Sequence, residues 1–157
     1  MKKTLQSASA SLALVFALGF ASILPLAPAY AVDNMESTDA PDLTSVRAKI
    51  KAKDYVAALT ELRDIAEDTQ QADVYNLLGF TLRKTGDFTT SLTYYTKALE
   101  LQPDHKAAHE YLGELYIEIG NTPKAKEQLD ALVRLCPGGC EEREDLEKAI
   151  DAKSATN

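Results

Sequence analysis

The sequence of 157 residues predicts an all-α fold, a right-handed superhelix of three antiparallel helix pairs closed by a C-terminal capping helix. Three observations support this prediction. Between Pro41 and Lys153 the apolar residues recur at helical spacing, and no stretch alternates as a strand does. Short breaks that contain Gly, Pro or Asn separate the periodic segments. A block of residues also recurs 34 positions further along the chain, which is typical of stacked helical units.

The first 31 residues are predicted to be a signal peptide and not part of the fold. Two lysines precede an apolar run from Leu12 to Leu26, and Ala29-Tyr30-Ala31 has the small-x-small pattern of a cleavage site. The alternative is an uncleaved membrane anchor, but the run is shorter than the ~20 residues that a spanning helix needs. We therefore expect cleavage after Ala31 and a bacterial protein that is periplasmic or secreted.

Local signals indicate where each helix begins and ends. Gly86 can end one helix, and Asp87 can cap the next. The segment 120–123 repeats this arrangement, with a proline that the first helical turn tolerates, and Pro103 with Asp104 closes another helix and offers the aspartate as a cap. Seven helices are expected, near 42–52, 55–67, 72–84, 88–101, 105–119, 123–135 and 141–153.

The 34-residue repeat fixes the register of the two best-matched units. Nine positions match, each one 34 residues from its counterpart: Tyr75, Leu78, Gly79, Leu82, Gly86, Ser91, Tyr95, Ala98 and Pro103 with His109, Leu112, Gly113, Tyr116, Gly120, Ala125, Leu129, Leu132 and Pro137. The glycines at 79 and 113 would let a paired helix approach closely, since they have no side chain. The aromatic and leucine side chains would fill the space between units.

This pattern of Leu-Gly, a following Tyr, small residues and a closing Pro resembles the tetratricopeptide repeat. The resemblance covers roughly residues 42–152 and implies helix pairs that present a groove to a partner. Tyr75 and His109 stand where Trp is usual in the family, and Ser91 stands where Ala is usual. The fold that the resemblance implies is specific, but the function is not, because many functions share one fold.

The repeat extends in degenerate form to both ends of the domain. A first unit lacks the Leu-Gly pair, and Leu43, Val46 and Ile50 supply its apolar stripe. At the other end Leu146 falls in register, but Glu147 replaces the glycine, as expected of a polar capping helix. The expected organisation is a flexible leader (32–41), repeats at about 42–71, 72–105 and 106–139, a capping helix (140–153) and a tail (154–157).

In tetratricopeptide proteins the first helix of each pair lines a concave groove, and the resemblance places the partner contacts there. The residues expected to line it are basic in the first two repeats and acidic in the third: Arg47, Lys51, Asn76, Phe80, Arg83, Lys84, Glu110, Glu114, Ile117 and Glu118. Such a groove would bind a peptide with acidic and basic ends in one direction. The alternative is that these charges only solvate helix faces. The family's clamp for a terminal carboxylate is not expected, because the third repeat has Glu where the clamp needs Lys or Arg.

Cys136 and Cys140 are expected to form a small disulfide between the last repeat and the capping helix, since paired cysteines oxidise outside the cytoplasm. A redox dithiol is disfavoured by the acidic residues that follow Cys140. A metal site would need more ligands. His109 is expected to be packed and His105 to be exposed, so neither completes one.

The formal net charge of −7 argues against a nucleic-acid partner, which requires clustered Lys and Arg. No nucleophile with its base and no phosphate-binding glycine loop is found, so we expect neither an enzyme nor a cofactor. The prediction is a non-catalytic protein-binding module or scaffold of the bacterial envelope, with self-association possible. The alternative is a thiol- or metal-handling protein that uses Cys136 and Cys140.

Overall fold

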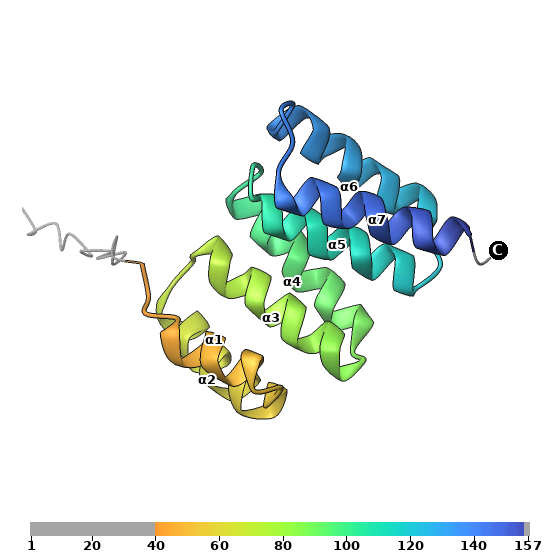
Figure 1. Cartoon of the computed structure of the whole chain (residues 1–157). Coiled ribbons are helices and arrows are strands. Elements are labelled where there is room, and N and C mark those ends of the chain that lie inside the picture. The colour runs from red at the N-terminus through yellow and green to blue at the C-terminus, as the bar shows by residue number, and fades with distance from the viewer. Residues whose placement is uncertain (1–39, 156–157) are drawn as a thin grey trace, which may run out of the picture. The chain divides into compact units, whose positions relative to one another are not determined.

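The computed structural model describes residues 40–155, which form seven α-helices and no strand (Figure 1). The predicted signal peptide and most of the predicted leader lie outside the described residues. The helices are α1 (Thr44–Lys51), α2 (Tyr55–Asp68), α3 (Ala72–Thr85), α4 (Phe88–Leu101), α5 (Lys106–Glu118), α6 (Thr122–Leu135) and α7 (Glu141–Ser154). Each helix begins and ends within two residues of the predicted bounds. No helix in this range is long and apolar enough to cross a membrane.

The helices form two layers in an array of antiparallel pairs. In Figure 1, α1, α3, α5 and α7 lie toward the viewer, and α2, α4 and α6 lie behind them. Each helix packs against the next along the chain, while α5 also contacts α3 and α7. This confirms the predicted fold of three helix pairs and a capping helix. We call the surface formed by α1, α3, α5 and α7 the front face, and the surface formed by α2, α4 and α6 the back face.

The helix ends follow the local sequence signals with one exception. Gly86 ends α3 with a φ of 89°, and the Asp87 side chain accepts a hydrogen bond from the backbone N–H of Thr90. The prediction of Asp104 as the cap of α5 is wrong. His105 occupies that position, and its Nδ1 accepts from the backbone N–H of Ala108 at 3.2 Å. An imidazole nitrogen satisfies the same free backbone donor that a carboxylate would.

Two glycines allow close contacts between helices, but with different partners. A Cβ built on Gly79 would lie 2.6 Å from the ring of Tyr95 in α4, its paired helix. A Cβ built on Gly113 would lie 2.5 Å from the side chain of Leu146 in α7. The expected contact with the paired helix is thus found at Gly79, whereas the atoms nearest to Gly113 belong to α7. At Gly113 the contact is with the capping helix, because α7 packs on α5 beside α6.

Both terminal units are tied to the core by apolar residues that the sequence indicated. Val46 of α1 and Leu62 of α2 are fully buried and pack with residues of α3. Leu146 and Ile150 of α7 are buried in a cluster with Leu132 of α6. The predicted tail begins too early, because α7 continues through Ser154, whose hydroxyl donates to the carbonyl of Ile150.

Cys136 and Cys140 form a disulfide with a Cα–Cα distance of 6.0 Å, as the sequence predicts. Cys136 follows the last residue of α6 and is buried, and Cys140 directly precedes α7. The bond therefore closes the turn that leads into the capping helix. It also occupies both cysteines of the chain, so neither is a free thiol.

We expect the double variant C136S/C140S to lose about 2 kcal/mol of unfolding free energy, since the disulfide closes only a short loop. Urea unfolding of the variant and of the oxidised native chain measures the difference. The native chain unfolded in the presence of a reductant should match the variant. Equal stability of the oxidised and reduced native chain would contradict this account.

Candidate functional site

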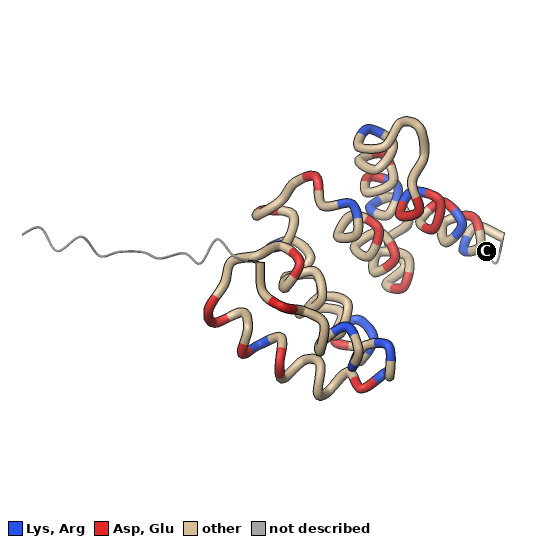
Figure 2. The backbone as a smooth tube through the Cα atoms, turned by 60° about the vertical axis from the view of Figure 1, so that its left-hand side comes forward, with Lys and Arg blue, Asp and Glu red and all other residues tan. Residues whose placement is uncertain are grey.

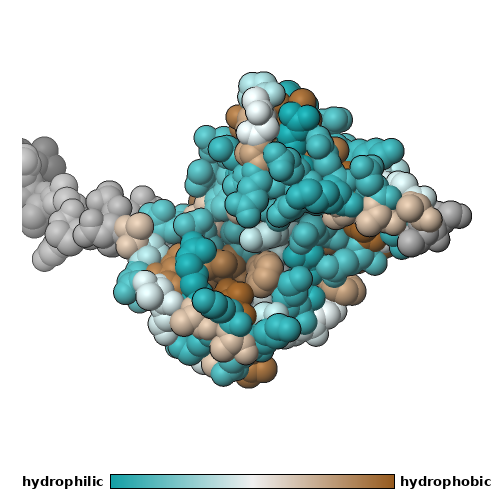
Figure 3. Space-filling view, viewed as in Figure 1, coloured by the Kyte–Doolittle hydropathy of each residue, from teal (hydrophilic) through white to brown (hydrophobic). Residues whose placement is uncertain are grey.

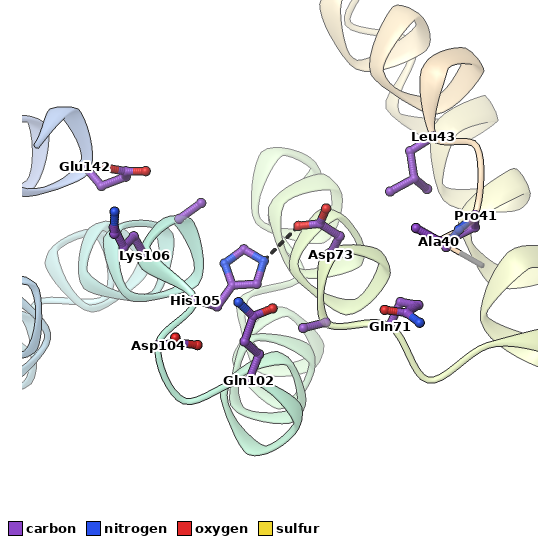
Figure 4. A pocket seen from close by; sticks show the side chains of 12 residues that line it. Ala40, Pro41, Leu43, Gln71, Asp73, Gln102, Asp104, His105, Lys106 and Glu142 are labelled. Atoms are coloured by element: carbon purple, nitrogen blue, oxygen red, sulfur yellow. Dashed lines mark hydrogen bonds and ion pairs between the residues drawn. The ribbon is translucent and has the colours of Figure 1, made fainter. Parts of the chain in front are cut away.

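One cavity on the front face lies at the N-terminal ends of its helices and has a volume of about 440 Å³. Figure 4 shows His105, the N-cap residue of α5, pointing across it to Asp73 of α3. The His105 Nε2 lies 2.9 Å from Asp73 Oδ1, and Arg47 of α1 lies 3.6 Å from the other carboxylate oxygen. The lining residues come from three helices and the segments beside them: Ala40, Pro41, Leu43, Gln71, Ala72, Asp73, Gln102, Asp104, His105, Lys106, Ala107 and Glu142.

His105 is buried, which contradicts the expectation that it is exposed. Its burial has a structural cause: Nδ1 accepts the backbone N–H of Ala108, so Nε2 carries the proton that is donated to Asp73. Both ring nitrogens are thus engaged. A histidine held in this way links the start of α5 to α3.

His109 is half-buried and also has both ring nitrogens in contact with partners. Its Nε2 lies 2.9 Å from the carbonyl oxygen of Pro103, and its Nδ1 lies 2.8 Å from the side-chain oxygen of Gln128. Within residues 40–155 no group of three or more His, Cys, Asp or Glu side chains is placed to hold a metal ion. The structure therefore offers no support for the thiol- or metal-handling alternative.

Arg83 does not lie where a partner could use it. The sequence placed it among the exposed groove residues, but only 4% of its surface is exposed. Its guanidinium forms ion pairs with Glu114 and Glu118, the second at 2.8 Å, and lies over the rings of Phe80 and Tyr111. Burial alone would lower the pKa of Arg83, but Tyr95 and the two glutamates outweigh it and raise the pKa. The predicted basic and acidic ends thus partly neutralise each other.

Two other predicted contact residues turn inward. Asn76 is 4% exposed, and its side-chain oxygen is buried without a hydrogen-bond partner among the described residues. Ile117 packs against the cluster of α6 and α7 that contains Leu132 and Leu146, so it is not an anchor beside Phe80. Both side chains therefore contribute to packing between helices and not to an open binding surface.

Glu110 is buried at the junction of α5 and α7. Burial raises its pKa to about 8, and the carboxylates of Glu114, Asp145 and Glu142 add to the shift, while Arg83 opposes it. Figure 2 shows Asp and Glu alternating with Lys and Arg along α7, the helix that supplies two of these acids. Most of the Glu110 carboxyl is therefore protonated at pH 7.

We expect Glu110→Gln to stabilise the protein near pH 8, because the amide carries no charge at this buried position. The gain should be about 1–2 kcal/mol, since water screens the partly exposed carboxylates nearby. The folded state holds its proton up to about pH 8, whereas the unfolded chain releases it near pH 4.5. The native chain therefore loses stability as the pH rises through this window. Urea unfolding from pH 4 to 9 should show the two curves diverging across it. Exposed Glu100→Gln is the control, and parallel curves for Glu110→Gln would contradict the assignment.

A second, smaller pocket of about 220 Å³ lies further along the front face, between α1, α3 and α5. Three predicted contact residues, Arg47, Lys51 and Phe80, meet there. Lys84 joins them, with its Nζ 5.2 Å from the centre of the Phe80 ring. Sequence reasoning missed Leu77 and Tyr111, which share a repeat position and complete the lining with Ile50. Their position directly before Leu78 and Leu112 is the signal that could have revealed them.

The fold and this face define a helical-repeat protein, and comparison with known proteins agrees. Residues 70–137 match the model of the tetratricopeptide repeat family. The matched residues include the whole of α3, α4, α5 and α6.

A solved structure titled "Crystal structure of MamA" superposes with a TM-score of 0.58 at 18% identity, covering 72% of this chain and 74% of that chain. It supports the fold alone. The uncharacterized protein ycf37 of Guillardia theta is 34% identical over 73 residues, 46% of this chain and 39% of that protein. The protein of the same name from Pyropia yezoensis is 30% identical over 64 residues, 41% and 36% of the two chains. The chain thus spans less than two fifths of the length of these relatives.

Proposed function

We propose that this chain is a non-catalytic interaction protein of the bacterial cell envelope, which binds a segment of another protein on its front face. Tetratricopeptide folds are typically interaction scaffolds. The observation that carries the proposal is the pocket between α1, α3 and α5, where apolar side chains stay partly open beside exposed basic residues. Natural interfaces combine an apolar centre with a polar rim in this way.

The envelope location is supported by the signal pattern at residues 1–31 and by the disulfide. Cell fractionation with intact-mass measurement tests it. We expect the protein in the periplasmic or secreted fraction, with Val32 as its first residue and both cysteines oxidised. A cytoplasmic protein that retains Met1 or the residues after it would overturn this part of the proposal.

Site-specific photo-crosslinking tests the binding face. A benzoylphenylalanine placed at Lys51 or Lys84 samples the front face, while the same group at Thr96 or Lys126 samples the back face. We expect adducts of defined mass from the first pair of positions only. Adducts from the back-face positions alone, or equally from all four, would show that the front face is not the binding surface.

A further inference from the structure

The pocket between α1, α3 and α5 has the size of one side chain. Its volume of about 220 Å³ lies below the roughly 300–1,000 Å³ that is usual for small-molecule sites. Ile50, Leu77, Phe80 and Tyr111 supply an apolar lining, and the last two rings lie 5.1 Å apart. Figure 3 shows a brown, hydrophobic hollow at the lower left of the front face, framed by teal hydrophilic side chains. This hollow is large enough for one large apolar side chain.

The charge at the mouth of this pocket is positive and largely unpaired. Lys51 and Lys84 are exposed, and neither forms an ion pair within residues 40–155. Arg47 approaches Asp73 at 3.6 Å, but both side chains are more than half exposed, so the pair is weak. The mouth therefore offers three cations with little internal compensation.

The acidic residues of α5 are not available to balance these cations. Glu114 and Glu118 are held in ion pairs by Arg83, whose guanidinium lies over the Phe80 ring. Glu110 lies with the carboxylates of α7 and keeps its proton at neutral pH because its pKa is raised. The α1–α3 half of the front face is therefore basic with an apolar centre, within a chain whose net charge is −7.

We propose that this pocket accepts one large apolar side chain of a protein segment that carries carboxylates on both sides of it. The apolar side chain fills the hollow beside Phe80 and Tyr111, and the flanking carboxylates meet Arg47, Lys51 and Lys84. Charge complementarity of this kind sets the choice of partner and the rate of encounter. The inference rests on the proposed function, because it names the partner chemistry for the same face.

Fluorescence anisotropy with model peptides tests the proposal on the full mature chain. The probe is an amidated, fluorescein-labelled peptide with one central Phe and a run of acidic residues on each side. We compare it with analogues that carry Leu or Ala at the centre, and with one in which Lys replaces every acid. We expect binding in the order Phe, Leu, Ala, with roughly tenfold or more between Phe and Ala, because burial of the ring is lost. The Lys analogue should not bind.

Single charge reversals locate the site without disturbing the core. Lys51→Glu and Lys84→Glu should each weaken binding of the Phe peptide roughly three- to tenfold at low salt, and less at high salt. Lys126→Glu on the back face is the matched control, since it is the same change at another exposed lysine. Circular dichroism checks that all three variants keep their helix content.

Several outcomes would overturn the proposal. Equal binding of the Phe and Ala peptides would show that the apolar pocket does not contribute to binding. Preferred binding of the Lys analogue would show that the face selects basic and not acidic segments. An equal effect of Lys126→Glu would show that only net charge matters. A dimer that Lys51→Glu dissociates would identify a second copy as the occupant. If photo-crosslinking on the front face succeeds while every acidic peptide fails, the proposed function stands and this inference alone falls.

Discussion

Replacing Gly79 by Ala should lower the unfolding free energy by about 2–3 kcal/mol, although Ala favours a helix by about 1 kcal/mol over Gly. The new Cβ would lie 2.6–2.9 Å from three ring atoms of Tyr95. That ring is fully buried, so it cannot move away without displacing the core around it. The carbonyl oxygen of the same glycine also accepts a hydrogen bond from the buried hydroxyl of Ser91, with an O···O distance of 2.7 Å. A shift of α3 relative to α4 would stretch this hydrogen bond.

Urea or thermal unfolding measures the effect, with Gly138→Ala as the matched control, because a Cβ there meets no atom within 4 Å. The Gly79→Ala change should be coupled to Tyr95. In a Tyr95→Leu background the smaller side chain makes room, and the added cost of Gly79→Ala should fall below about 1 kcal/mol. If Gly79→Ala is as stable as Gly138→Ala, the close contact between α3 and α4 does not depend on this glycine.

The helices could be predicted because each one carries its own local signals. Gly86 with Asp87, and Asn121 with Pro123, mark a stop and a start within a few residues, and the structure uses both. The 34-residue register then placed Tyr95, Leu112 and Leu146 in the interior, where they are found. Position within one helix was enough for these assignments.

The candidate site was harder to predict because its charges pair across helices. Arg83 reads as an exposed cation at the end of α3, but its partners Glu114 and Glu118 lie 31 and 35 residues away on α5. His105 reads as a polar residue at a helix start, and its burial depends on Asp73, which is 32 residues away. Helical periodicity indicates which face a residue lies on. It does not indicate which opposite charge the next repeat brings to that face.

Removal of the Arg83 guanidinium should cost more than any other charge change on this face. Only 2% of the Arg83 side chain is exposed, whereas Glu114 and Glu118 are 28% and 39% exposed. Arg83→Met keeps an unbranched chain of similar length at this buried position but leaves two glutamates without their cation. We expect a loss of about 3 kcal/mol, the lower part of the range for breaking a buried ion pair, because the glutamates can turn toward water.

A comparison of single and combined variants separates the contribution of the Arg83 ion pairs from that of its contacts with Phe80 and Tyr111. Arg83→Met/Glu114→Gln/Glu118→Gln removes all three charges together, and we expect it to recover at least half of the loss, because no unpaired carboxylate remains. Lys84→Met, at the neighbouring exposed lysine, should change stability by less than about 0.5 kcal/mol. Urea unfolding at pH 7 measures all of them.

If the triple variant is no more stable than Arg83→Met, the guanidinium acts through its contacts with Phe80 and Tyr111 and not through its charge. In that case Glu114 and Glu118 of α5 would be available to a partner. The front face would then offer an acidic region on α5 beside the basic region on α1 and α3.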